Sequence, residues 1–176
     1  SFNSLQFNDN NKPYNPLINA GSIMAVSLIK PEESSDVRYD FILNQWKRMV
    51  GDKEVGFNNS VYLSEKNTAH RNFALAHLMM ENDVFPEDTN IEETLELYFQ
   101  CCSLTMNSVA LAKFAAILAN SGDEINQDEN HESNNEEKSN LIKPSIVKDM
   151  LCVMYSSGMY DYSGQFSFEV GLPAKS

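Results

Sequence analysis

Helical patterning fills most of this chain and gives way to alternation only near its end. Apolar residues recur at helical spacing in successive stretches up to about residue 155, whereas Gln165–Val170 alternates polar and apolar side chains. Such alternation is typical of a strand, and one strand is not stable without partners. We therefore expect sheet partners outside this chain. The pattern predicts an α-rich piece of an α+β protein.

Start and stop signals set the expected helix limits. Asn15 and Pro16 predict an N-cap and first turn for a buried helix over 17–30, which Pro31 ends. Gly51 ends a second helix, and Asn90 with Glu93 resembles a capping box. The expected helices after the first cover 35–50, 69–81, 90–102, 107–120 and 144–155, with an irregular stretch over 57–68.

Charge argues against a nucleic-acid partner. The chain has 13 basic and 25 acidic residues, a net charge of −12, and phosphate binding needs clustered cations. Residues 123–140 hold seven of the acidic residues and one Lys, in an Asn-rich setting. Such a composition cannot bury a core, so we expect a disordered insertion there. No apolar run reaches the length of a membrane span.

Cysteine and histidine spacing predict neither a disulfide framework nor a metal site. Cys101, Cys102 and Cys152 fit no paired or CxxC pattern, which favours idle thiols in a reducing compartment. His70 and His77 are separated by about 10 Å of helix rise if both lie on one helix, too far to ligate one metal directly. We expect no metal site on this spacing.

Two Ser-x-x-Lys matches carry little weight on their own. This spacing places a lysine amine one helical turn from a serine hydroxyl, as one class of acyl-transfer enzymes requires. Ser27–Lys30 and Ser145–Lys148 both fit, but with 19 Ser and 10 Lys about one match is expected by chance. Ser27 also falls at the end of its helix rather than at the start.

Two sets of polar residues could hold a small zwitterion. Glu65 and Asn72 are seven residues apart and would share a face of a continuous helix, although a solvated helix face is the commoner reason for such a pair. Tyr98 and Tyr160 could relay protons or bind a substrate, although half-buried core tyrosines are common.

Taken together, six short motifs make the chain resemble the serine-dependent glutaminases. Each is weak alone, but their order and rough spacing match over nearly the whole chain except the acidic insertion. The motifs are Phe2–Leu5, Asn15–Gly21, Ser64-Glu65 with His70–Asn72, Tyr98–Gln100, Gly158–Asp161 and Gly171–Ser176.

The resemblance implies a partial catalytic domain over 1–176. The implied fold is α+β and β-lactamase/transpeptidase-like, and this chain would hold mostly its helical part plus the start of the antiparallel sheet. The implied reaction is hydrolysis of L-glutamine to L-glutamate and ammonia through a serine acyl-enzyme, without metal or organic cofactor. The residues that match the family's substrate-contacting positions are Asn19, Glu65, Asn72, Tyr98 and Tyr160, with Tyr160 and Tyr98 beside the serine as proton relays.

The resemblance also places the nucleophilic Ser-x-x-Lys before Phe2, so we expect this chain alone to be inactive. Phe2–Asn11 matches a loop that, in animal-type members, couples phosphate activation and homotetramer assembly to activity. This sequence has Ser4 where those members carry Lys. Phe85–Thr89 and Ser27–Lys30 lean toward animal mitochondrial forms, with a cytoplasmic protein as the alternative.

Two further functions stay open at this stage. A non-catalytic glutamine-binding or assembly module would also lack the nucleophile. Another Ser-x-x-Lys acyl-transfer enzyme, such as a penicillin-recognising protein, would share the fold. A Glu suited to an α-ammonium favours a free amino acid as ligand, which argues against the penicillin-recognising alternative and leaves the glutamine-binding module open.

Overall fold

The computed structural model of the protein describes residues 3–124 and 140–176. Helices dominate, with two very short strands. The helices are α1 (Asn19–Ser27), α2 (Ser35–Val50), α3 (Asn59–Asn67), α4 (His70–Glu81), α5 (Ile91–Cys102), α6 (Ser108–Ala119), α7 (Pro144–Ser157) and α8 (Ser163–Val170), with short 3-10 turns at Asp52–Glu54 and Tyr160–Tyr162. The strands are β1 (Val55–Phe57) and β2 (Leu104–Met106).

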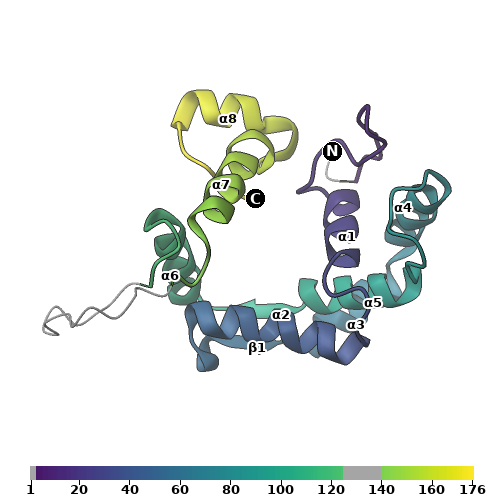
Figure 1. The fold of residues 1–176 in the computed structure, drawn as a ribbon, viewed down its shortest axis with the longest axis horizontal. Coiled ribbons are helices and arrows are strands. Elements are labelled where there is room, and N and C mark those ends of the chain that lie inside the picture. The colour runs from purple at the N-terminus through teal and green to yellow at the C-terminus, as the bar shows by residue number, and fades with distance from the viewer. Residues whose placement is uncertain (1–2, 125–139) are drawn as a thin grey trace, which may run out of the picture.

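Helix α5 lies at the centre of the packing. Helices α1, α2, α3 and α4 all pack on it. In Figure 1, α2 and α3 lie beside α5 in the lower part of the view, and α1 and α4 lie above it. Its apolar positions Leu95, Leu97 and Phe99 are almost fully buried, and burial of such side chains contributes about 1.5–3 kcal/mol each. The core cluster comprises Ile18, Ala20, Ile23, Val26, Ala69, Ala76, Met79, Val84, Leu95, Leu97, Tyr98 and Phe99.

The two strands form a small antiparallel ladder, in which β2 follows α5 in the chain and β1 packs on α2. Val55 pairs with Met106, Gly56 with Thr105 and Phe57 with Leu104. Asn58 N then donates to Ser103 O at 2.9 Å, which extends the pairing to the start of α3. The ladder was not predicted, because three-residue strands carry too few side chains to show alternation.

Helices α6, α7 and α8 form one side of the molecule, and α1 and α4 the other (Figure 1). Helix α7 packs on α8, and the Asn15 side-chain amide donates to Ser157 O at the end of α7, at 3.3 Å. This contact joins the segment before α1 to the turn that carries Tyr160.

Most expected helices are confirmed. Helix α2 has the predicted limits and ends at Gly51 (φ 110°), and the Asn90 side chain caps α5 by accepting from Glu93 N at 3.2 Å. Asn107 accepts from Ala110 N at 2.8 Å and caps α6. These signals succeed because each cap involves residues within three positions of one another.

Helix α1 is buried as expected but shorter than predicted. It begins at Asn19, and its N-cap Ile18 makes no side-chain hydrogen bond, so the N-cap assigned to Asn15 is wrong. Asn15 Oδ1 instead accepts from Leu17 N at 2.8 Å, which folds 15–17 into a turn. That turn lies on the helix at Gly21, where a Cβ would be 2.5 Å from Pro16 Cα.

The strand predicted over Gln165–Val170 is wrong, because this segment is helix α8. Gln165 Nε2 donates to Glu169 Oε1 at 2.8 Å, an i,i+4 pair that only a helix brings together. Phe168 is 92% exposed, so the alternation does not reflect one buried face. This segment therefore gives no reason to expect sheet partners outside the chain.

The irregular stretch predicted over 57–68 is also wrong. It contains the end of β1 and then helix α3, whose N-cap is Asn58. Asn58 Oδ1 accepts from Ser60 N at 3.0 Å and from Val61 N at 3.1 Å. The expected acidic insertion over 123–140 lies almost wholly outside the described residues.

We expect Asn58→Ala to destabilise the protein by about 1 kcal/mol, because two N–H groups at the start of α3 lose their acceptor. Urea denaturation followed by circular dichroism measures this change. Asn44→Ala, an exposed position inside α2, is the matched control and should change stability by less than about 0.5 kcal/mol. Equal effects of the two variants would contradict the capping role.

Candidate active site

Two asparagines on different helices meet at the first candidate subsite. Asn19 is the first residue of α1, and Asn72 lies in the first turn of α4, where it is 9% exposed. Asn19 Nδ2 donates to Asn72 Oδ1 at 3.3 Å and to Asn3 Oδ1 at 2.9 Å. The two helices pack on one another, which holds the amides together.

Tyr98 lies on α5 next to this pair of helices and is 9% exposed. Burial raises its pKa well above the ordinary tyrosine range, and the neighbouring Cys102, Glu65 and Tyr160 raise it further. Tyr98 is therefore protonated at neutral pH and acts as a hydrogen-bond donor. Glu65 and Tyr160 each lie close enough to Tyr98 to raise its pKa.

Glu65 reaches this region from α3 rather than from the helix that carries Asn72. Thr68 ends α3 and His70 begins α4, so the two residues do not share one continuous helix face. Glu65 is half-buried, and α3 packs on α5, which carries Tyr98. The seven-residue spacing from Glu65 to Asn72 therefore does not place the two residues on one helix face.

Tyr160 occupies an unusual backbone conformation. Its φ is 53°, in the left-handed region that bulky residues rarely adopt. Such residues cluster at functional sites, where the surrounding structure holds them in place. Its ring packs against the core cluster that contains Tyr98. Its hydroxyl accepts from Lys175 Nζ at 2.9 Å and donates to Ser176 O at 3.3 Å.

The structure thus relates the five predicted residues in two sets. Asn19 and Asn72 share a hydrogen bond, and Glu65 and Tyr160 each lie close enough to Tyr98 to raise its pKa. Neither Asn3 nor Lys175 was among the predicted site residues, although the resemblance likens Lys175-Ser176 to the start of a Lys-Ser/Thr-Gly motif. The motifs that contain both residues were visible, but no local pattern shows that they contact Asn19 and Tyr160.

Neither internal Ser-x-x-Lys match lies in this region with a reactive geometry. Ser27 is 2% exposed and donates to Met24 O at 2.7 Å, a bond within its own helix. Ser145 is exposed in the first turn of α7, and Lys148 is exposed too. These observations agree with assigning no nucleophile to either serine.

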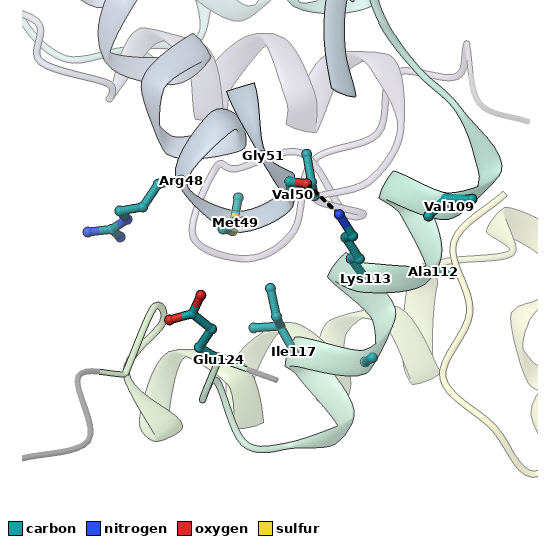
Figure 2. A pocket seen from close by; sticks show the side chains of 10 residues that line it. Arg48, Met49, Val50, Gly51, Val109, Ala112, Lys113, Ile117 and Glu124 are labelled. Atoms are coloured by element: carbon teal, nitrogen blue, oxygen red, sulfur yellow. Dashed lines mark hydrogen bonds between the residues drawn. The ribbon is translucent and has the colours of Figure 1, made fainter. Parts of the chain in front are cut away.

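One hollow in the described part of the chain lies away from these residues. It has a volume of about 620 Å³ and lies between the end of α2 and α6. Figure 2 shows Lys113 pointing across it and donating to Val50 O, at 3.3 Å. None of the five candidate residues lines it, so we do not assign it to the site.

The described residues contain no group of three or more His, Cys, Asp or Glu side chains that could hold a metal ion. Burial, together with a smaller effect of the neighbouring Cys102, raises the pKa of the Cys101 thiol to about 11. Cys101 therefore carries a protonated, weakly nucleophilic thiol at neutral pH.

None of the helices in the described residues has the length and apolar character that a membrane span requires.

Comparison with known proteins decides the family. The sequence profile named Glutaminase matches residues 1–176. The chain belongs to the Glutaminase family. Among its relatives, "Putative glutaminase 3" of Caenorhabditis elegans is 46% identical over 175 residues, which cover 99% of this chain and 28% of that protein. "Glutaminase liver isoform, mitochondrial" of Rattus norvegicus is 38% identical, with 99% of this chain and 27% of that protein covered.

Solved structures of glutaminases are similar to this chain and show its fold. A crystal structure of a probable glutaminase of Bacillus subtilis covers the whole chain with a TM-score of 0.82 and 31% identity. A Bacillus glutaminase crystallised in 4.3 M NaCl also gives 0.82, at 32% identity. The predicted α+β, β-lactamase-like fold class is confirmed. The chain spans 53% and 55% of those two proteins, and about a quarter to a half of the curated relatives it matches.

Proposed function

We propose that the protein containing this chain hydrolyses L-glutamine to L-glutamate and ammonia through a serine acyl-enzyme. This chain would supply substrate recognition and a proton-relay tyrosine, and a Ser-x-x-Lys that precedes Ser1 would supply the nucleophile. The observation that carries the proposal is the convergence of Asn19, Asn72, Tyr98, Glu65 and Tyr160 in a chain that matches the Glutaminase family throughout.

Each group has a chemical task in this proposal. The Glu65 carboxylate pairs with the α-ammonium of free glutamine. The amides of Asn19 and Asn72 bind the α-carboxylate or the side-chain amide. The buried, protonated Tyr98 donates a further hydrogen bond.

The reaction then proceeds in two balanced steps. The serine oxygen attacks the δ-carbon of glutamine, the C–N bond breaks, and nitrogen leaves as ammonia after taking a proton that Tyr160 relays from the serine hydroxyl. Water next attacks the acyl ester, its proton returns to the serine oxygen, and glutamate leaves. Because Tyr160 both gives and receives a proton, it ends each cycle in its starting state.

The test of the proposed function is ammonia release from L-glutamine by the intact protein. Glutamine-dependent ammonia release with equimolar glutamate is the expected result. Absence of ammonia release would contradict the proposal. Covalent labelling by a β-lactam in a protein that does not hydrolyse glutamine would favour another Ser-x-x-Lys enzyme.

We expect Glu65→Gln to lower kcat/KM for L-glutamine by roughly 10- to 100-fold, because a neutral amide cannot pair with the α-ammonium. Steady-state kinetics on the intact protein measure the change. Glu33→Gln, the same chemical change at an exposed loop position, is the control and should leave kcat/KM unchanged. Similar values for Glu65→Gln and the native protein would remove Glu65 from the substrate site.

Location and assembly belong to the same proposal. A mitochondrial protein is supported by the names of the rat and mouse relatives, each 38% identical to this chain. We also infer a homotetramer from the resemblance of Phe2–Asn11 to the animal-type loop. The same resemblance makes phosphate the proposed activator, although Ser4 stands where animal-type members carry a lysine.

A further inference from the structure

Helix α3 carries Glu65 but buries none of its own residues. Within this helix only Tyr62 and Glu65 are half-buried, and the other seven residues are exposed. The two residues are three positions apart and therefore share one face of the helix. Tyr62 packs against the core cluster, and Glu65 lies close enough to Tyr98 on α5 to raise its pKa. The position of Glu65 thus depends on the contacts that hold this face of α3 on α5.

A polar cluster joins α3 to α5 beside Glu65. This Glu96 cluster consists of Glu96 on α5 and of Tyr62 and Lys66 on α3. The Tyr62 hydroxyl donates to Glu96 Oε1. The Lys66 ammonium lies 2.9 Å from Glu96 Oε2 and donates to Glu96 Oε1 at 3.2 Å. The same ammonium donates to the Tyr62 hydroxyl oxygen at 3.3 Å, so each member of the cluster contacts the other two.

The Glu96 cluster is placed to fix α3 more than to stabilise the fold. The Lys66 and Glu96 side chains are 50% and 33% exposed, and an exposed ion pair adds little to the free energy of unfolding. Its contacts nevertheless attach the turn of α3 that contains Glu65, because Tyr62 precedes Glu65 by three residues and Lys66 follows it directly. A misplacement of about 1 Å at a functional site can cost about 100-fold in rate. A small shift of α3 would therefore matter for the substrate site even where the fold is kept.

From these contacts we infer that Glu96 is a positioning residue for Glu65. It holds α3 on α5 so that the Glu65 carboxylate stays where it meets the α-ammonium of free glutamine. The inference rests on the proposed function. Because Glu96 acts through Glu65 and not on the reacting atoms, its influence should appear in KM for a substrate with a free α-ammonium, and not in kcat.

The test measures the steady-state kinetics of Glu96 variants in the intact protein with L-glutamine as substrate. Glu96→Ala removes both oxygens, and we expect KM to rise roughly 5- to 20-fold with kcat changed less than about twofold. Glu96→Gln keeps an oxygen that can accept from Tyr62 and Lys66, so KM should stay within about threefold of native. Tyr62→Phe removes only one hydroxyl and should raise KM by about 2- to 5-fold. Glu92→Ala, at an exposed position in the first turn of α5, is the matched control and should behave as native.

Two further measurements separate positioning from a general loss of structure. N-acetyl-L-glutamine lacks the α-ammonium, so its kcat/KM should change less than about twofold in Glu96→Ala. In a Glu65→Gln background, Glu96→Ala should also change kcat/KM for L-glutamine by less than about twofold.

Several results would overturn the inference while leaving glutaminase activity in the native protein. These are a native KM for Glu96→Ala and Tyr62→Phe, a loss that Glu96→Gln does not restore, equal losses for both substrates, and equal losses with and without Glu65→Gln. Absence of activity in the native protein would overturn the proposed function and this inference together.

Discussion

Replacement of Tyr160 by Phe is expected to lower kcat for glutamine hydrolysis by roughly 100- to 10,000-fold, which is the range that general acid–base groups contribute. The ring stays, so packing against the core cluster is retained, and only the hydroxyl that contacts Lys175 and Ser176 is lost. Steady-state ammonia release measures kcat, and single-turnover acylation shows whether the loss lies in the first chemical step.

Tyr155→Phe is the matched control for this prediction. Its hydroxyl lies 3.4 Å from Ser167 O on the exposed side of α7, so the same chemical change removes one surface contact. We expect kcat to change by less than about twofold. The relay assignment would be wrong if Tyr160→Phe retained native kcat, or if both phenylalanine variants lost activity equally.

Gly158→Ala is expected to lower the free energy of unfolding by roughly 2–3 kcal/mol, because the added methyl group would meet backbone atoms that have little room to move. The overlapping atom is Ala174 O, and Met154 O would be 2.6 Å away. Gly158 has φ −69°, which any residue can adopt, so space and not conformational freedom requires the glycine. Urea denaturation of the intact protein measures the loss.

The same substitution should also reduce kcat, because displacing Ala174 moves Lys175 away from Tyr160. Gly164→Ala in α8 is the control, since no atom lies within 4 Å of the added Cβ. Its stability should stay the same or rise by up to about 1 kcal/mol, as for glycine replaced in a helix. Equal losses of stability in Gly158→Ala and Gly164→Ala would contradict the packing role of Gly158.

Local signals predicted the helices well and failed where the pattern was short. Asn90, Asn107, Pro144 and Gly51 each mark a helix end through bonds or conformations within a few residues, so sequence alone locates them. In Gln165–Val170, six residues with two aromatic rings at alternate positions cannot separate strand from helix. The Gln165–Glu169 pair is one local contact that favours the helix.

The candidate site depends on contacts that no local pattern contains. The candidate site residues were predicted from the motif resemblance. Their proximity depends on the packing of α1, α3 and α4 on or around α5. Asn19 and Asn72 are 53 positions apart, and Lys175 reaches Tyr160 only because the chain reverses at Gly171 and passes Gly158 closely. Spacing along one helix would have placed Glu65 and Asn72 on one face, but the break at Thr68 separates them.

The most direct test of the account is the preference of the intact protein for L-glutamine over N-acetyl-L-glutamine, which lacks the α-ammonium. The account predicts that the native protein favours free glutamine in kcat/KM by roughly 10- to 100-fold, and that Glu65→Gln removes most of this preference. A preference that persists unchanged in Glu65→Gln, or equal hydrolysis of both compounds by the native protein, would contradict the substrate site described for this chain.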